Sequence, residues 1–109
     1  EIAGNRMMTD VPQSDVIIVN PTHYAVALKW SRAPGAAPTC VAKGVDHIAQ
    51  AIREAAFEHG VPVHSDPPAA RALYAGTDIG QEVDASQYRA VAAAIRFADQ
   101  MRRRAGHTR

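Results

Sequence analysis

Residues 15–30, DVIIVNPTHYAVALKW, constrain the fold more than any other stretch of the chain. Residues 15–20 are dominated by β-branched side chains and are too short for a helix, which is typical of a strand buried on both faces. From residue 24 to residue 30, large apolar residues alternate with alanine or lysine, so this second strand has two different faces. The sequence therefore predicts two successive strands with the turn Asn20–His23 between them.

The remaining elements follow from hydrophobic spacing and from residues that start or stop helices. Pro67 suits the first position of a helix capped by Asp66, and Gly60 suits the end of another. Gly44 is expected to turn the chain after a third strand. The other expected elements are strands at 39–43 and 61–65, helices at 45–59, 67–74 and from about residue 86, and a weak helix end at 1–10. The order strand-strand-strand-helix-strand-helix-helix predicts a small α/β domain, with helices around a mixed four-stranded sheet.

Length and composition fit one domain and exclude several classes of protein. The chain has 109 residues, 47% of them hydrophobic and 21% charged, which is a globular balance. A formal net charge of +1 argues against a domain that binds nucleic acid through its overall charge. One cysteine excludes an internal disulfide, and no apolar run approaches the roughly 20 residues that span a membrane.

We expect three segments along the chain. Residues 1–14 are predicted to be a linker or the end of a helix from a missing membrane part, since the chain starts at Glu1 without an initiator methionine. Residues 15–100 form the domain itself. Residues 101–109 form a basic tail, which is either a solvated helix end or a contact for an acidic partner or for lipid headgroups.

The Asn20-Pro21 bond carries unusual chemistry. Asparagine is usually modified when the backbone nitrogen of the next residue attacks its side-chain amide, but proline has no N–H and closes that route. The Asn20 side-chain nitrogen can instead attack the Asn20 backbone carbonyl and expel the Pro21 nitrogen, which breaks the chain. A fold can accelerate this slow reaction by holding the reacting atoms about 3 Å apart and by donating N–H groups to the developing oxyanion.

Proton transfer for this reaction can come from His23, three residues after Asn20. In a four-residue turn the first and last Cα atoms lie within about 7 Å, and an imidazole readily moves protons near neutral pH. Thr22 supplies a hydroxyl and backbone groups at the bend. The alternative is that Asn20 and Pro21 simply form a type I turn, where both residues are favoured.

Other residue types offer weaker candidate sites. Cys40 could pair with a histidine as a nucleophile, but no nucleophile motif surrounds it, and a lone cysteine in a strand is usually a small core residue. The five histidines lack metal-ligand spacing, so we expect no metal and no cofactor.

Four segments in order resemble the cytoplasmic domain of the FlhB/YscU family, the switch proteins of flagellar and injectisome type III secretion. They are DVPQSDVIIVNPTHYAVAL, VAKGVDHIAQAIREAAFEHGVPV, PPAARALY and DIGQEVDASQYRAVAAAIRFA. The likeness covers about residues 7–100, and VAKG with AFEHG favours the flagellar branch.

The resemblance implies self-cleavage between Asn20 and Pro21 without a protease. Asn20 is then the nucleophile, Pro21 the new N-terminus, Thr22 the residue that shapes the loop and His23 the residue that assists proton transfer. The reaction occurs once per molecule, so the chain is not a multiple-turnover enzyme. The two pieces stay together, and cleavage switches export from rod and hook proteins to filament proteins.

The resemblance also implies a location and partners. It places the domain at the cytoplasmic face of the bacterial inner membrane, anchored through missing N-terminal helices within the flagellar export apparatus. Expected partners are other export-gate subunits, a length-control protein, export substrates and chaperones, but no nucleic acid. Contact residues on the predicted 67–74 helix are Pro67, Pro68, Arg71 and Tyr74. The alternative function is a docking module that binds substrates or chaperones without cleaving itself.

Overall fold

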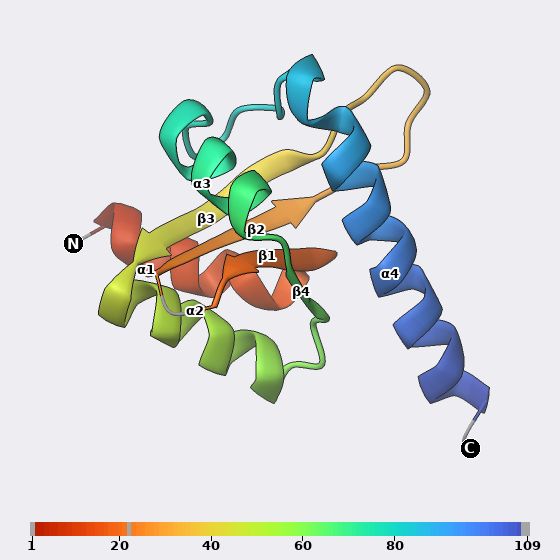
Figure 1. Ribbon diagram of the computed structural model, residues 1–109. Helices are drawn as coiled ribbons and strands as arrows, with labels where there is room; N and C mark the ends of the chain where they lie inside the picture. The colour runs from red at the N-terminus through yellow and green to blue at the C-terminus, as the bar shows by residue number, and fades with distance from the viewer. Residues whose placement is uncertain (1, 22, 108–109) are drawn as a thin grey trace.

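A mixed four-stranded sheet forms the centre of the computed structural model, which describes residues 2–21 and 23–107 (Figure 1). The strands are β1 (Val16–Asn20), β2 (Tyr24–Lys29), β3 (Thr39–Val45) and β4 (Val63–Ser65). Their order across the sheet is β3-β2-β1-β4. Neighbours β1–β2 and β2–β3 are antiparallel, whereas β1 and β4 are parallel. The predicted mixed sheet is therefore confirmed.

Helices cover both faces of this sheet. The helices are α1 (Ile2–Asp10), α2 (Asp46–Glu58), α3 (Pro67–Gly76) and α4 (Tyr88–His107), with short 3-10 turns at Val11–Gln13 and Ala85–Gln87. In Figure 1, α1 and α2 lie on one side of the sheet, and α3 and α4 lie on the other. None of the helices in the described ranges is long and apolar enough to cross a membrane.

Strand β1 is buried on both faces, as its β-branched composition predicts. Val16 and Ile18 belong to the core shared with α3 and α4, whereas Ile17 and Val19 belong to the core shared with α2. The alternation in β2 is confirmed in the same way, because Val26 faces the first core and its small neighbours face the second. Strand β1 therefore lies at the centre of the molecule.

The prediction that Gly44 turns the chain is wrong. Strand β3 continues to Val45, and Gly44 pairs with Ala25 of β2. A Cβ atom at position 44 would overlap the side chain of Ile48 in α2. Glycine is needed here because the first turn of α2 packs directly against the strand.

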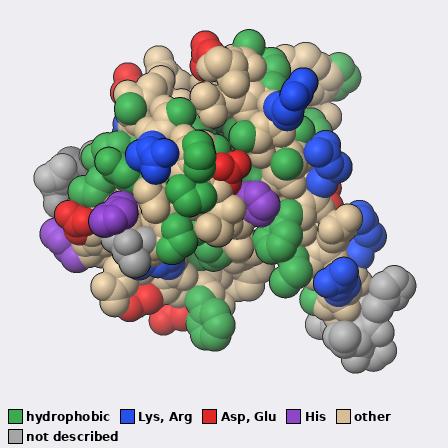
Figure 2. Space-filling model, in the orientation of Figure 1, with side chains coloured by type: hydrophobic (Ala, Val, Ile, Leu, Met, Phe, Trp, Pro, Cys, Tyr) green, Lys and Arg blue, Asp and Glu red, His purple; other side chains and the backbone are tan. Residues whose placement is uncertain are grey.

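Both chain ends are helical where the structure describes them. The predicted helix end at 1–10 is present as α1, and Val11, within the predicted segment 1–14, is fully buried in the core beneath α2. Helix α4 continues to His107, so most of the segment 101–109 is a helix end, one of its two predicted forms. Figure 2 shows blue arginine side chains one below another along the α4 side of the molecule. The division of the chain into three segments stays a prediction.

Candidate functional site

The predicted Asn20–His23 turn forms the tip of the β1–β2 hairpin. Asn20 is the last residue of β1 and pairs with Tyr24, the first residue of β2. The side chain of Asn20 is half-buried, while Pro21 and His23 are exposed. Thr22, the predicted loop-shaping residue, lies outside the described residues. The structure therefore places Asn20, Pro21 and His23 together at one exposed end of an otherwise buried strand.

A backbone hydrogen bond closes this turn at the carbonyl that the predicted reaction attacks. The N–H of His23 donates to the carbonyl oxygen of Asn20 at 2.8 Å. This oxygen belongs to the Asn20-Pro21 peptide bond. A donor at 2.7–3.1 Å from a developing oxyanion is the geometry found in oxyanion holes, where about 10²- to 10³-fold in rate is lost when one donor is removed. The Asn20 carbonyl oxygen is thus already hydrogen-bonded to a backbone donor in the folded turn.

Two backbone hydrogen bonds join the turn region to neighbouring helices. The N–H of Asp46, at the start of α2, donates to the carbonyl of His23 at 3.0 Å. The N–H of Asp66 donates to the carbonyl of Val19 at 3.0 Å. The Asp66 side chain also caps α3 by accepting from the N–H of Ala69, as the sequence predicts. Both ends of the turn are therefore tied to elements far away in sequence.

The predicted partner-binding residues all lie on α3. Pro68 and Arg71 are exposed, whereas Pro67 and Tyr74 are half-buried. The Tyr74 ring lies 5.0 Å from the Tyr24 ring, centroid to centroid. The Tyr74 carbonyl also accepts a hydrogen bond from Lys43 at 2.8 Å. Tyr74 thus packs beside the first residue of β2, and only Pro68 and Arg71 present themselves fully to solvent.

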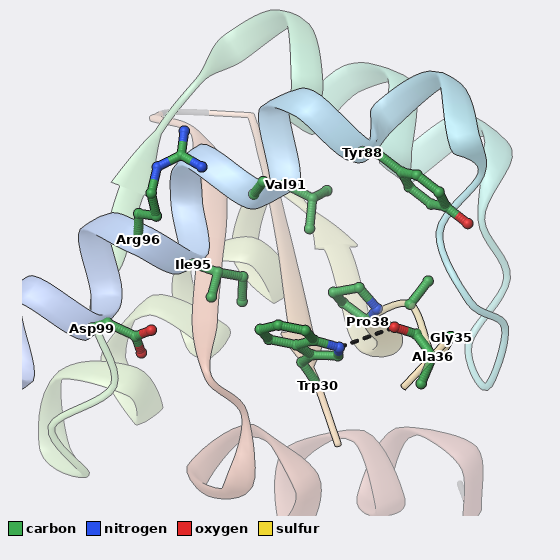
Figure 3. Close-up of a pocket in the computed structure, with 11 residues that line it drawn as sticks. Trp30, Gly35, Ala36, Pro38, Tyr88, Val91, Ile95, Arg96 and Asp99 are labelled. Atoms are coloured by element: carbon green, nitrogen blue, oxygen red, sulfur yellow. Dashed lines mark hydrogen bonds between the residues drawn. The ribbon is translucent and has the colours of Figure 1, made fainter. Parts of the chain in front are cut away.

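Sequence reasoning missed a hollow of about 460 Å³ between the 31–38 loop and α4. In Figure 3, Val91 and Ile95 point from α4 toward Trp30 and Pro38, whereas Arg96 points away from the indole. The full lining is Trp30, Gly35, Ala36, Ala37, Pro38, Tyr88, Val91, Ala92, Ile95, Arg96 and Asp99. The single tryptophan followed by an alanine- and proline-rich loop was the signal that could have indicated this surface.

Long-range contacts fold the loop back to form this hollow. The indole N–H of Trp30 donates to the carbonyl of Ala36 at 3.0 Å. Arg32 forms an ion pair with Asp99 of α4 at 2.8 Å, and its guanidinium lies 4.8 Å from the centre of the Trp30 ring. Hydrogen bonding to Asp99 raises the pKa of Arg32. The loop is therefore held as one wall of an apolar surface.

Among the described residues, Cys40 and the histidines offer neither an activated nucleophile nor a metal site. Cys40 is fully buried in the core, and burial raises the pKa of its thiol to about 11. The thiol is therefore protonated at neutral pH and is a poor nucleophile. No group of three or more histidine, cysteine, aspartate or glutamate side chains in the described ranges is arranged to hold a metal ion.

Comparison with known proteins identifies the family of this chain. The model of the FlhB HrpN YscU SpaS family matches residues 1–98. The chain belongs to this family. It is 48% identical to the flagellar biosynthetic protein FlhB of Salmonella typhimurium over 101 residues, which are 93% of this chain and 26% of that protein. FlhB of Bacillus subtilis is 47% identical over 97 residues, 89% of this chain and 27% of that protein.

Solved structures of the family show the same fold. The cytoplasmic domain of FlhB from Shewanella putrefaciens matches with a TM-score of 0.88 and 42% identity, covering 95% of this chain and 80% of that one. A mutated EscU C-terminal domain matches with a TM-score of 0.79 and 32% identity, covering 84% and 92%. The chain spans about a quarter of the length of the curated relatives it matches.

Proposed function

We propose that this domain cuts its own chain once, between Asn20 and Pro21, and that the cut switches a flagellar type III export apparatus from rod and hook proteins to filament proteins. The observation that most directly supports the proposed cleavage is the hydrogen bond from the His23 N–H to the Asn20 carbonyl oxygen, which is 2.8 Å long. Membership of the family supports the switching role. The reaction is a single turnover within one molecule, so the domain is not an enzyme in the usual sense.

The reaction is a ring closure on Asn20. Its side-chain nitrogen attacks its own backbone carbonyl carbon, and the electron pair of that carbonyl moves to the oxygen, where the His23 N–H stabilises the negative charge. When the carbonyl re-forms, the bond to Pro21 breaks. The attacking nitrogen loses one proton and the Pro21 nitrogen gains one, so no water is consumed. The products are a cyclic imide at the end of residues 1–20 and a free amine on Pro21.

His23 contributes in two separable ways in this mechanism. Its backbone N–H stabilises the oxyanion, whereas its exposed imidazole carries a proton from the attacking nitrogen toward the leaving nitrogen. The imidazole works at the solvent-facing side of the turn, where water can complete the transfer. Thr22 is proposed to shape the bend, as the family resemblance implies.

Mass spectrometry of freshly purified wild-type protein tests the proposal. We expect two chains, residues 1–20 and 21–109, that elute together before denaturation. The short chain should first be one water lighter than the free acid, because ring closure rather than hydrolysis released it. A chain that stays unbroken in the folded form at neutral pH would refute self-cleavage.

The same measurement distinguishes a second candidate function, a docking module that never cleaves itself. The observation that favours docking is the apolar hollow beside Trp30, which suits an extended segment of an export substrate. One domain could both dock a partner and cleave itself, because the hollow beside Trp30 and the Asn20–His23 turn lie at opposite ends of β2. An unbroken chain would leave docking as the whole function, while two chains would make it an accompanying one.

Partners and location are proposed from the family. We place the domain at the cytoplasmic face of the bacterial inner membrane, within the export apparatus. Other export-gate subunits, a length-control protein, substrates and chaperones are the proposed partners. Among the predicted contact residues, Pro68 and Arg71 are the ones exposed enough to meet such a partner directly, while Pro67 and Tyr74 would support them from below.

His23→Ala should slow cleavage by about 10²-fold without abolishing it, which is the lower range for losing a general acid–base group. Alanine keeps the backbone N–H that bonds to the Asn20 carbonyl, so the oxyanion stays stabilised. Rates measured by denaturing gel between about pH 5 and 9 should also lose the pH dependence that the imidazole confers. His59→Ala, which removes an exposed histidine beyond the end of α2, is the control. Equal rates and pH profiles for both variants would remove the imidazole from the mechanism.

A further inference from the structure

The corner between β3 and α2, residues Gly44, Val45 and Asp46, lies against the hairpin that carries the scissile bond. Val45 pairs with Tyr24 and Gly44 pairs with Ala25 in the β2–β3 ladder. One residue later and in the same register, the Asp46 N–H donates to the carbonyl of His23 at 3.0 Å, just beyond the last paired residues of the ladder. This corner is therefore the nearest scaffold to the turn on the β2 side.

Asp46 adopts a backbone conformation that few residues favour. Its φ is +49°, and among the described residues other than glycine only Arg32 also has a positive φ. This left-handed region is uncommon for residues with a Cβ atom, although aspartate tolerates it better than most. Residues held in such conformations gather at functional sites, where the surrounding structure over-determines them. At position 46 that conformation coincides with the bond to the His23 carbonyl.

Packing of α2 against β3 restricts the position of this corner. A side chain at Gly44 would overlap the side chain of Ile48, so the first turn of α2 packs closely against β3. Ala49 and Ile52 anchor the same helix in the core. The corner therefore has little freedom to shift, and the Asp46 N–H is presented to the turn by a rigid element.

His23 is consequently held at both of its backbone groups. Its N–H points to the Asn20 carbonyl at 2.8 Å, and its C=O receives the Asp46 N–H at 3.0 Å. If the second bond were lost, the backbone torsion angles at His23 could change and its N–H could leave the Asn20 carbonyl. Misplacing a reacting group by about 1 Å can cost 10²-fold in rate.

We propose that Asp46 is a positioning residue for self-cleavage, acting through its backbone N–H to keep the His23 N–H aimed at the Asn20 carbonyl. The inference rests on the proposed self-cleavage and assigns a role in it to a residue outside the Asn20–His23 turn. Asp46 touches none of the reacting atoms. Its effect on the rate is transmitted through one hydrogen bond to His23.

The test removes that N–H alone. The domain is assembled by chemical ligation with the Asp46 amide replaced by an ester, so that the side chain stays and the donor is lost. Cleavage is followed by mass spectrometry from the start of refolding. The control carries the same replacement at Gln87, whose N–H donates to the Asp84 carbonyl at 2.9 Å in a turn outside the scissile hairpin.

We expect the ester at position 46 to slow cleavage about 10- to 100-fold and the ester at position 87 to leave it unchanged. On the uncleavable Asn20→Ala background, the His23 amide proton should exchange faster with solvent in the position-46 ester, while both esters unfold at similar temperatures.

Other results would contradict either the positioning role of Asp46 alone or the proposed self-cleavage as well. If the position-46 ester cleaves as fast as wild type, Asp46 has no positioning role, although self-cleavage itself stands. A slower rate that merely follows a lower unfolding temperature would make the role one of general stability, and the inference fails. If the ligated wild-type chain never cleaves while folded, self-cleavage and this inference fall together.

Discussion

Asn20→Ala is expected to leave the chain unbroken while the domain folds as before. The substitution removes the attacking nitrogen, and no solvent nucleophile can replace it, because well-oriented groups within one molecule react at effective molarities of about 10⁵–10⁸ M. The fold should survive since Asn20 is half-buried at the last position of β1 and contributes no apolar surface to either core. Denaturing gels should show one full-length chain over days in which wild type is fully cut.

Two further variants distinguish ring closure by the Asn20 amide from other reactions at the Asn20-Pro21 bond. Asn20→Asp keeps the shape of the side chain but lacks the amide nitrogen, so it too should stay uncut. Pro21→Ala restores an N–H after Asn20 and reopens the ordinary route, in which the alanine nitrogen attacks the side-chain amide. That chain should accumulate deamidated Asn20 without a break. Cleavage of Asn20→Ala at the same bond would disprove ring closure.

The Asn20–His23 turn could be predicted from the sequence because the residues that specify it are close together in the chain. The β-branched run before Asn20 and the alternating run after it each specify a strand, so the four residues between them had to form the turn. The Asp66 cap of α3 was predictable for the same reason, since the aspartate and Pro67 are adjacent. These features depend on side chains within a few positions of each other.

Features that depend on contacts between residues far apart in the chain could not be predicted from the sequence. The sequence around Gly44 predicts a turn, yet Gly44 is a strand residue whose missing side chain leaves space for the side chain of Ile48. The hollow beside Trp30 requires Arg32 to reach Asp99, 67 positions along the chain. The Asp46 N–H meets His23 only because β3 pairs with β2. The position of the turn was therefore predictable, but the contacts that orient it were not.

Retention of the short piece after cleavage depends on the same central strand, and Ile18→Ala should weaken it strongly. Residues 1–20 would remain attached through β1, which lies between β2 and β4, and Ile18 is 0% exposed. Truncating a fully buried isoleucine to alanine costs about 2–5 kcal/mol. Even about 2 kcal/mol raises a dissociation constant by roughly 30-fold. Upon dilution, the cut variant should release residues 1–20 at concentrations where cut wild type stays whole.

Size-exclusion chromatography followed by mass spectrometry measures this release. Ile79→Ala deletes the same atoms from a side chain that is 44% exposed, so it should retain the short piece like wild type. Ile18→Ala combined with Asn20→Ala cannot lose the piece, and its lower unfolding temperature reports the burial energy alone. If cut Ile18→Ala held residues 1–20 as tightly as wild type, burial of β1 would not be what keeps the pieces together. The packing of α1 and Val11 beneath α2 would then have to carry the retention.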